Sequence, residues 1–152
     1  MTIYAAGLRV SEVTNLKVKH IDSKNMHIIT KQDNGKKDRY TLLSKTNLDI
    51  LREYWKRYHP STYLFPGKAL NCHISVRTIQ KIFEHAKDDT NIKKEASVHT
   101  LMHSFATHLL ESGIDICHIQ RLLGHASINA TTIYLHLRRM DLINIKSPLD
   151  TI

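Results

Sequence analysis

The sequence has few cysteines and no long apolar run, and both features narrow the classes of protein that it can encode. Its 152 residues include only two cysteines, Cys72 and Cys117, which are far apart and lack CxxC spacing. A disulfide scaffold or a cysteine-rich zinc module is therefore not expected. No apolar run reaches the length of a membrane span, and no secretory signal opens the sequence. We expect one domain in a reducing, cytosolic compartment, with no membrane partner.

Internal repeats and low-complexity segments are also absent, and acidic residues are outnumbered by basic ones. The formal net charge is +8 and the isoelectric point is about 9.6. This balance favours a polyanionic partner such as nucleic acid. The first residues lie inside an apolar helical pattern that has no N-terminal cap, so we expect the domain to be truncated at its N-terminus.

The hydrophobic periodicity predicts a mainly α domain with a small antiparallel β-sheet, the α+β class. Residues 3–18 have helical spacing interrupted by Gly7, and Ser11 with Glu12 indicates a fresh helix start. Two short β-prone runs, 26–30 and 39–43, flank Asn34-Gly35, a strong hairpin signal. Ser44 predicts the cap of a helix over 46–58 that Pro60 ends.

The second half of the sequence is predicted to be helical almost throughout. A helix over 74–89 has Ile79, Ile82, Phe83 and Ala86 on one face. The next helix covers 97–113 and stops at Gly113. Asp115 is the expected cap of a helix that closes near Gly124, and a further helical stretch runs over 127–137.

Several short motifs occur in order along the chain with tight spacing: GLRVSE, a basic hairpin ending KDRYTLLS, LFPG, HTLMHSFATHLLESG, IQRLLGH and TTIY. Each is unremarkable alone, because an arginine at a helix start or lysines at a hairpin tip are common surface features. Together the six motifs make the chain resemble the tyrosine recombinases of the phage-integrase family, most closely the integron- and transposon-type integrases. The resemblance covers essentially the whole chain.

The resemblance implies the tyrosine recombinase catalytic-domain fold, of the DNA breaking-rejoining type, over residues 1–152, without the N-terminal helical core-binding (SAM-like) domain. In such enzymes a tyrosine hydroxyl attacks a DNA phosphodiester, forms a 3′-phosphotyrosyl link and releases a 5′-hydroxyl. No metal or other cofactor is used. Fixed cationic donors stabilise the charge on the non-bridging oxygens, and arginine suits this role because its planar fork never loses its charge.

Carried over by resemblance, Tyr134 is the nucleophile and Arg9 is the first phosphate-clamping arginine. His99 opens the HxxR-type motif, where it would bond phosphate or assist proton transfer, and His125 would donate to a non-bridging oxygen. His103 lies one residue beyond Met102, about 100° around the helix, and is expected to face elsewhere. His103 and His108 are therefore interpreted as packing or surface polar groups.

Two positions depart from the family pattern. The motif requires an arginine three residues after His99, and this chain has Met102, which carries neither charge nor donor. The family also places a lysine on the hairpin as general acid for the leaving 5′-oxygen. An ungapped match puts Asn34 there; a shifted turn offers Lys36, which we favour, or Lys31, and the lysine can also be missing altogether.

The resemblance further implies double-stranded DNA as partner and a homotetramer on that DNA, with the tail near residue 147 packing on a neighbour. A prokaryotic, nucleoid-associated setting follows from the same comparison. The candidate DNA-contacting residues are Lys37, Arg39, Arg77 and Lys81.

Three other interpretations remain open at this point. The first is an inactive DNA-binding remnant of an integrase, because Met102 breaks the clamp. The second is a metal hydrolase using His99 and His103, which at i, i+4 share one helix face. The third is a structural helical domain whose positive charge serves solubility alone; it predicts no salt-sensitive affinity for DNA.

Overall fold

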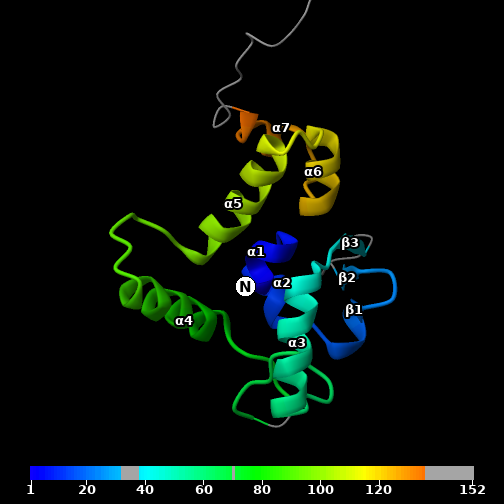
Figure 1. Cartoon of the computed structure of the whole chain (residues 1–152), viewed down its shortest axis with the longest axis vertical. Helices are drawn as coiled ribbons and strands as arrows, with labels where there is room; N and C mark the ends of the chain where they lie inside the picture. The colour runs from blue at the N-terminus through cyan, green and yellow to red at the C-terminus, as the bar shows by residue number, and fades with distance from the viewer. Residues whose placement is uncertain (32–37, 70, 136–152) are drawn as a thin grey trace, which may run out of the picture.

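The computed structural model describes residues 1–31, 38–69 and 71–135. The sheet and the first three helices form one part of the molecule, and the last three helices pack together at its far end (Figure 1). Within the described residues no helix combines the length and apolar character needed to cross a membrane. The mainly α architecture with a small antiparallel sheet confirms the fold class predicted from the sequence.

The N-terminal segment forms two short helices, α1 (Thr2–Ala6) and α2 (Val10–Thr14), on either side of a glycine turn. Gly7 ends α1 in the left-handed conformation, with φ 58°. The start of α2 differs from the prediction. Its N-cap is Arg9 and not Ser11, because the Glu12 carboxylate accepts a 2.7 Å hydrogen bond from the Arg9 backbone N–H.

The sheet has three antiparallel strands in the order β1-β2-β3. A 3₁₀ turn, η1 (Val18–His20), leads into β1 (Ile21–Asp22), followed by β2 (His27–Thr30) and β3 (Arg39–Leu42). The prediction missed β1, which is only two residues long. The Asn34-Gly35 turn predicted between β2 and β3 lies outside the described residues, while the pairing of Thr30 with Arg39 places the two strands as a hairpin.

In strand β3 the polar side chains face the interior and the larger apolar side chains face outward, the reverse of the usual arrangement. Arg39 and Thr41 face inward and are buried, whereas Tyr40 and Leu42 face outward. Thr41 donates a 2.6 Å hydrogen bond to the carbonyl of Ala6, so its side chain satisfies a carbonyl at the C-terminal end of α1. The inward side of this strand is therefore built from polar anchors.

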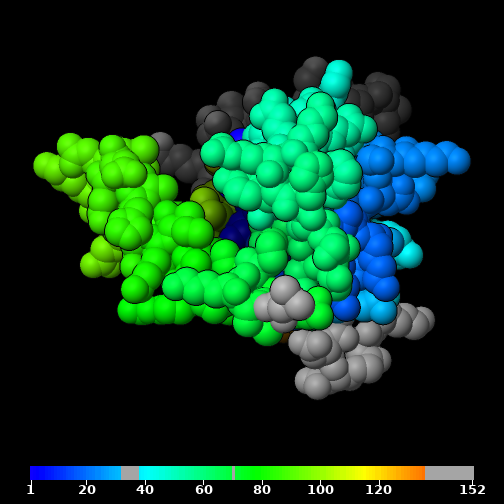
Figure 2. Space-filling view, turned by 90° about the horizontal axis from the view of Figure 1, so that it is seen from below, coloured from blue at the N-terminus to red at the C-terminus, as the bar shows by residue number. Residues whose placement is uncertain are grey.

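Helix α3 (Lys45–Tyr58) begins as predicted, because the Ser44 hydroxyl accepts from the backbone N–H of Asn47 at 3.2 Å. It ends at Tyr58, where His59 adopts a left-handed conformation just before Pro60. Helix α4 (Val76–Asp89) lies on the other side of α3 from the strands (Figure 2). No residue of α4 is fully buried, and 56% of Ile82 on its apolar face is exposed.

The C-terminal helices are α5 (Val98–Glu111), α6 (Ile116–Leu123) and α7 (Asn129–Thr132). Asp115 caps α6 as predicted, accepting from the backbone N–H of Cys117 at 2.7 Å. Gly124 ends α6 in the left-handed conformation, with φ 63°. Helix α5 stops at Glu111, with Ser112 as its C-cap and Gly113 following at φ 85°.

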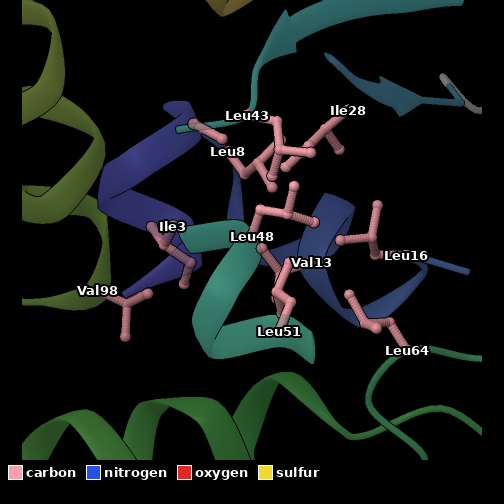
Figure 3. Close-up of a cluster of buried hydrophobic side chains, with 11 residues drawn as sticks. Ile3, Leu8, Val13, Leu16, Ile28, Leu43, Leu48, Leu51, Leu64 and Val98 are labelled. Carbon is pink, nitrogen blue, oxygen red and sulfur yellow. The ribbon is translucent and has the colours of Figure 1, made fainter. Parts of the chain in front are cut away.

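Two apolar clusters hold these elements together. The larger joins α1, α2, the sheet and α3, and its side chains point toward one another between these elements (Figure 3). The smaller cluster lies among α5, α6 and the residues after α7, and comprises Met102, Phe105, Ala106, Leu110, Ile119, Leu123 and Tyr134. The expected nucleophile and the expected arginine position thus belong to the same apolar cluster.

Candidate active site

Tyr134 is almost completely buried directly after α7, with 1% of its surface exposed. Its hydroxyl oxygen lies 2.9 Å from Nδ1 of His103 on α5, and the two ring centroids are 5.6 Å apart. The hydroxyl is therefore held at hydrogen-bond distance by an imidazole that the sequence did not assign to the site.

Burial raises the pKa of Tyr134, and the positive charge of Arg9 partly offsets this rise. Burial also lowers the pKa of His103, with a smaller contribution in the same direction from His99. Both shifts favour the neutral forms. Near neutral pH the pair is consequently a neutral phenol facing a neutral imidazole.

Arg9 spans the distance between α2 and the end of α6. Its Nη1 lies 3.4 Å from Oε1 of Glu12, and its Nη2 donates to the carbonyl of Gly124 at 3.4 Å. About a third of its side chain, 32%, is exposed. The guanidinium is thus fixed in orientation by a carboxylate and a helix end, while one part of it is open to a ligand.

His125 follows Gly124 and is half-buried near Arg9. Its Nδ1 lies 2.9 Å from the hydroxyl of Thr131 on α7. Burial lowers the pKa of His125, and the positive charges of Arg9 and Arg39, and of His103 when it is protonated, lower it further. Burial and the neighbouring positive charges therefore both favour the neutral imidazole of His125.

Arg39 requires a correction, because it was predicted to contact DNA and is in fact buried. Only 6% of its side chain is exposed. Its guanidinium donates to both Glu12 carboxylate oxygens, at 3.0 Å from Nε and 2.6 Å from Nη2. It also donates to the carbonyls of Leu122 and Gly7. Arg39 links the sheet to α2 and α6 behind the site, and its charge is paired there with the Glu12 carboxylate.

The predicted site residues are only partly brought together. Arg9, His125 and Tyr134 gather around the end of α6. His99 lies on the first turn of α5, exposed, with its ring centroid 6.3 Å from that of His103. It borders a pocket of about 220 Å³ that Arg77 of α4 also lines. His99 is therefore adjacent to the cluster, on the side that faces α4.

The remaining basic candidates lie on the surface or outside the described residues. Arg77 and Lys81 are exposed on α4, and Lys31 is exposed just after β2. Lys36 and Lys37 fall in residues 32–37, outside the described part of the chain. The choice between Lys36, Lys31 and no lysine stays a prediction.

Met102 occupies a buried position on α5, with 5% of its surface exposed. It belongs to the apolar cluster that contains the Tyr134 ring. A methionine here contributes packing and neither a charge nor a hydrogen-bond donor. At this position the chain has an apolar contact where the family pattern has a cation.

In the described ranges 1–31, 38–69 and 71–135, no three histidine, cysteine, aspartate or glutamate side chains form a group that could hold a metal ion. The two histidines considered for a metal site are used differently. His103 is turned to the Tyr134 hydroxyl, and His99 is exposed beside α4.

A family model for the phage integrase family matches residues 1–140 of the chain. The chain belongs to the phage integrase family. This integrase domain is 40% identical, over 137 residues, to the tyrosine recombinase XerA of Pyrococcus horikoshii, covering 88% of this chain and 47% of that protein. The resemblance read from the six motifs is confirmed.

The integrase domain is also similar to solved structures of recombinases. The integrase domain superposes on a crystal structure of XerA recombinase with a TM-score of 0.83 and 31% identity, covering 93% of this chain and 52% of that one. It superposes on XerH site-specific recombinase, bound to a palindromic difH substrate in a post-cleavage complex, with a TM-score of 0.82 and 28% identity. That match covers 93% of this chain and 42% of the XerH chain. The chain spans about half the length of the curated relatives it matches.

His103 is the residue that sequence reasoning missed in this integrase domain. When His103 is compared with Met102 alone, the 100° rotation between successive helical residues places it on a different face of the helix from Met102. Comparison with His99 gives the opposite result, because residues at i and i+4 share a face. The i, i+4 spacing of the two histidines was the available signal, and it had been considered only for a metal.

Proposed function

We propose that this integrase domain breaks and rejoins double-stranded DNA through a covalent 3′-phosphotyrosyl intermediate formed on Tyr134. The observation that carries the proposal is the gathering of Arg9 and His125 around the end of α6, next to the Tyr134 hydroxyl. A nucleophile beside fixed cationic and imidazole donors is the arrangement that phosphoryl transfer requires.

In the proposed reaction the Tyr134 oxygen attacks phosphorus and the bond to the 5′-oxygen breaks. Arg9 neutralises charge on the non-bridging oxygens, since its orientation is already fixed by Glu12 and Gly124. His125 and His99 are proposed as further donors to the phosphate. The broken bond's energy is kept in the phosphotyrosyl ester, so a second 5′-hydroxyl can reverse the step.

The proposed chemistry needs no metal. The leaving 5′-oxygen takes a proton from a lysine near the hairpin, either Lys36 or Lys31, or from water if neither reaches it. Lys31, just after β2, is exposed.

Double-stranded DNA is proposed as the partner, with a homotetramer as the assembly on DNA and the prokaryotic nucleoid as the setting. The net charge of +8 supports a polyanionic ligand. Arg77 and Lys81 on the exposed face of α4, together with Lys37, are the proposed phosphate contacts. A XerH recombinase with 28% identity was solved on its difH substrate, which supports the same class of ligand.

Met102 is proposed to slow the reaction of this chain. Loss of one preorganised donor to a transition state lowers the rate by about 10²- to 10³-fold. We therefore expect cleavage by the natural chain to be slow compared with a variant that carries the arginine.

The test is a suicide DNA substrate, nicked so that the cleaved strand diffuses away and the phosphotyrosyl adduct accumulates. The adduct is measured on denaturing gels for the natural chain, for Met102→Arg and for Met102→Leu. Met102→Leu is the matched control, because it keeps the apolar volume and adds no charge. The proposal expects a Tyr134-dependent adduct that Met102→Arg increases by about 100-fold or more and Met102→Leu does not.

Tyr134→Phe is the negative control and must abolish the adduct in every background. An adduct that persists in Tyr134→Phe would reject Tyr134 as the nucleophile. The absence of any adduct in both the natural chain and Met102→Arg, with DNA binding intact, would instead identify the domain as a DNA-binding remnant.

A further inference from the structure

None of the residues assigned above has been given the role of accepting the proton of the Tyr134 hydroxyl. When the Tyr134 oxygen attacks phosphorus it must lose its hydroxyl proton, and a buried phenol with a raised pKa does not release it spontaneously. Arg9 is a permanent cation and accepts no proton. The group in contact with the hydroxyl is His103, at 2.9 Å through Nδ1.

We propose that His103 is a catalytic residue of this domain: it accepts the Tyr134 proton as the phosphotyrosyl bond forms. This inference rests on the proposed function and extends it. The hydroxyl O–H bond breaks, its proton moves to Nδ1, and the oxygen–phosphorus bond forms as the 5′-oxygen leaves and takes a separate proton from water or a cationic side chain. In the reverse step the imidazolium returns its proton to the departing tyrosine oxygen.

The arrangement of the imidazole fits this role. Nδ1 can accept from the hydroxyl only in the tautomer that carries its proton on Nε2, and only when the ring is neutral. Burial lowers the pKa of His103, which favours the neutral ring near pH 7. The distance of 2.9 Å lies within the range over which a positioned base removes a proton.

Among the groups around this position, His99 also lowers the pKa of His103 and so favours the neutral imidazole. His99 lies one turn earlier on the same helix, Arg9 approaches from the start of α2, and His125 lies beyond the end of α6. Arg39 comes from β3, and its charge is matched by Glu12. Glu12 is already bound by Arg39 and Arg9, so its carboxylate is not directed at His103.

The other two imidazoles of the site are less suited to accept this proton. His125 uses its Nδ1 on the Thr131 hydroxyl. His99 is exposed, with its ring centroid 6.3 Å from that of His103. His103 is the imidazole for which a contact with the Tyr134 hydroxyl is found.

The experiment uses three variants of the full chain, in both the natural and the Met102→Arg background. His103→Asn places an amide near the position of Nδ1, where it can accept a hydrogen bond without taking up a proton. His103→Ala removes the contact altogether. His108→Asn is the matched control, because His108 on the same helix also holds a tyrosine hydroxyl, that of Tyr4, through Nδ1 at 2.8 Å.

Single-turnover formation of the adduct is measured from pH 5 to pH 9. We expect His103→Asn and His103→Ala to lower the plateau rate by about 10²- to 10⁴-fold, the range for loss of a general base, and His108→Asn to leave it unchanged. The acidic limb of the natural profile should disappear in His103→Asn. An unchanged rate with the limb retained would overturn the role of His103.

A substrate with sulfur in place of the bridging 5′-oxygen separates a base from an acid. Sulfur leaves without needing a proton, so the loss of a general acid is rescued and the loss of a general base is not. We expect no rescue of His103→Asn. Full rescue would assign His103 to the leaving group and reject the role proposed here.

A readout without DNA keeps this inference separate from the proposed function. NMR titration of the histidine side chains should show that Tyr134→Phe changes the titration of His103, while Tyr4→Phe changes that of His108 instead. If this coupling is found but neither background forms an adduct, the proposed function fails although the pair exists. If an adduct forms at the normal rate without His103, only the present inference fails.

Discussion

Arg39 holds Glu12 from a buried position, with Nε 3.0 Å from Oε1 and Nη2 2.6 Å from Oε2. The same carboxylate accepts from the backbone N–H of Arg9 at 2.7 Å and lies 3.4 Å from its Nη1. One side chain of α2 therefore orients the exposed arginine of the site and neutralises the buried one behind it.

Neutralising this carboxylate should destabilise the fold. Glu12→Gln leaves the buried Arg39 charge without its partner, and breaking a buried ion pair in this way lowers the free energy of unfolding by about 3–5 kcal/mol. Urea denaturation measures the loss. The control is Asp49→Asn, which removes an exposed pair with Arg52 at 3.5 Å and should change the free energy of unfolding by less than about 1 kcal/mol. Equal effects of both substitutions would contradict the structural role of Glu12.

Removing the Arg9 side chain should affect catalysis far more than stability. Its guanidinium is partly exposed and rests on groups that water can also satisfy. Arg9→Ala is expected to lower the rate of adduct formation by about 10²- to 10³-fold, as loss of a transition-state donor does. Thermal unfolding of the variant and of Arg52→Ala, an exposed arginine of α3, provides the comparison. A strong loss of stability without a specific loss of rate would count against a phosphate role for Arg9.

Gly7→Ala should be strongly destabilising. Gly7 has φ +58°, and a Cβ there would lie 2.4 Å from Cδ1 of Phe105 on α5. A left-handed alanine costs about 1–2 kcal/mol, and forcing extra volume into a packed contact costs about 1–3 kcal/mol more. The matched control is Gly113→Ala, at φ +85° with nothing within 4 Å of the added Cβ, which should show the backbone cost alone. Phe105→Leu should recover part of the Gly7→Ala loss, measured by chemical denaturation.

The domain should lose stability as pH falls below about 6.5, the ordinary histidine value. Burial lowers the pKa of His20, His103 and His125 in the folded chain. The unfolded chain then binds more protons than the folded one between the lowered values and 6.5, so stability rises with pH in that window. Urea denaturation at pH 7.5 and 5.5 tests this. His20→Gln should reduce the difference in the free energy of unfolding between the two pH values. A domain that is more stable at pH 5.5 than at pH 7.5 would contradict this prediction.

Arg77 and Lys81 should contribute to DNA affinity through phosphate contacts. Replacing both by alanine should weaken binding to all sequences alike and reduce the slope of log affinity against log salt by about 2, because each contact releases counterions. Fluorescence anisotropy with a duplex over a salt series measures the slope. Replacing Lys56 and Arg57 of α3 by alanine removes the same amount of charge from another helix and should leave the salt slope unchanged. Equal losses would mean that net charge alone attracts the DNA.

Local signals in the sequence predicted much of this fold, because caps and glycines act through neighbouring backbone groups. Ser44 and Asp115 each accept from a backbone N–H two or three residues on, as expected. Gly124 closes α6 through a left-handed turn. Arg9, His125 and Tyr134 were predicted by motif, and the structure brings them together.

What the sequence could not provide were the contacts made across the fold. Arg39 has the appearance of a surface charge on a hairpin strand, and only the distant Glu12 carboxylate makes its burial possible. Arg39 and Thr41 can both face inward on β3 because groups on other elements satisfy their polar atoms. His103 was interpreted as a packing or surface polar group because it was compared with Met102 alone, whereas its partner, Tyr134, lies 31 residues further along the chain.

The burial of Tyr134 has a kinetic consequence. A hydroxyl group in a residue that is 1% exposed cannot meet a phosphodiester until its surroundings open. Under the proposed function, the frequency of that opening is an upper limit on the cleavage rate, however well charge and proton transfer are arranged. Between openings, Tyr134 would then be unreactive toward DNA bound by the proposed basic surface.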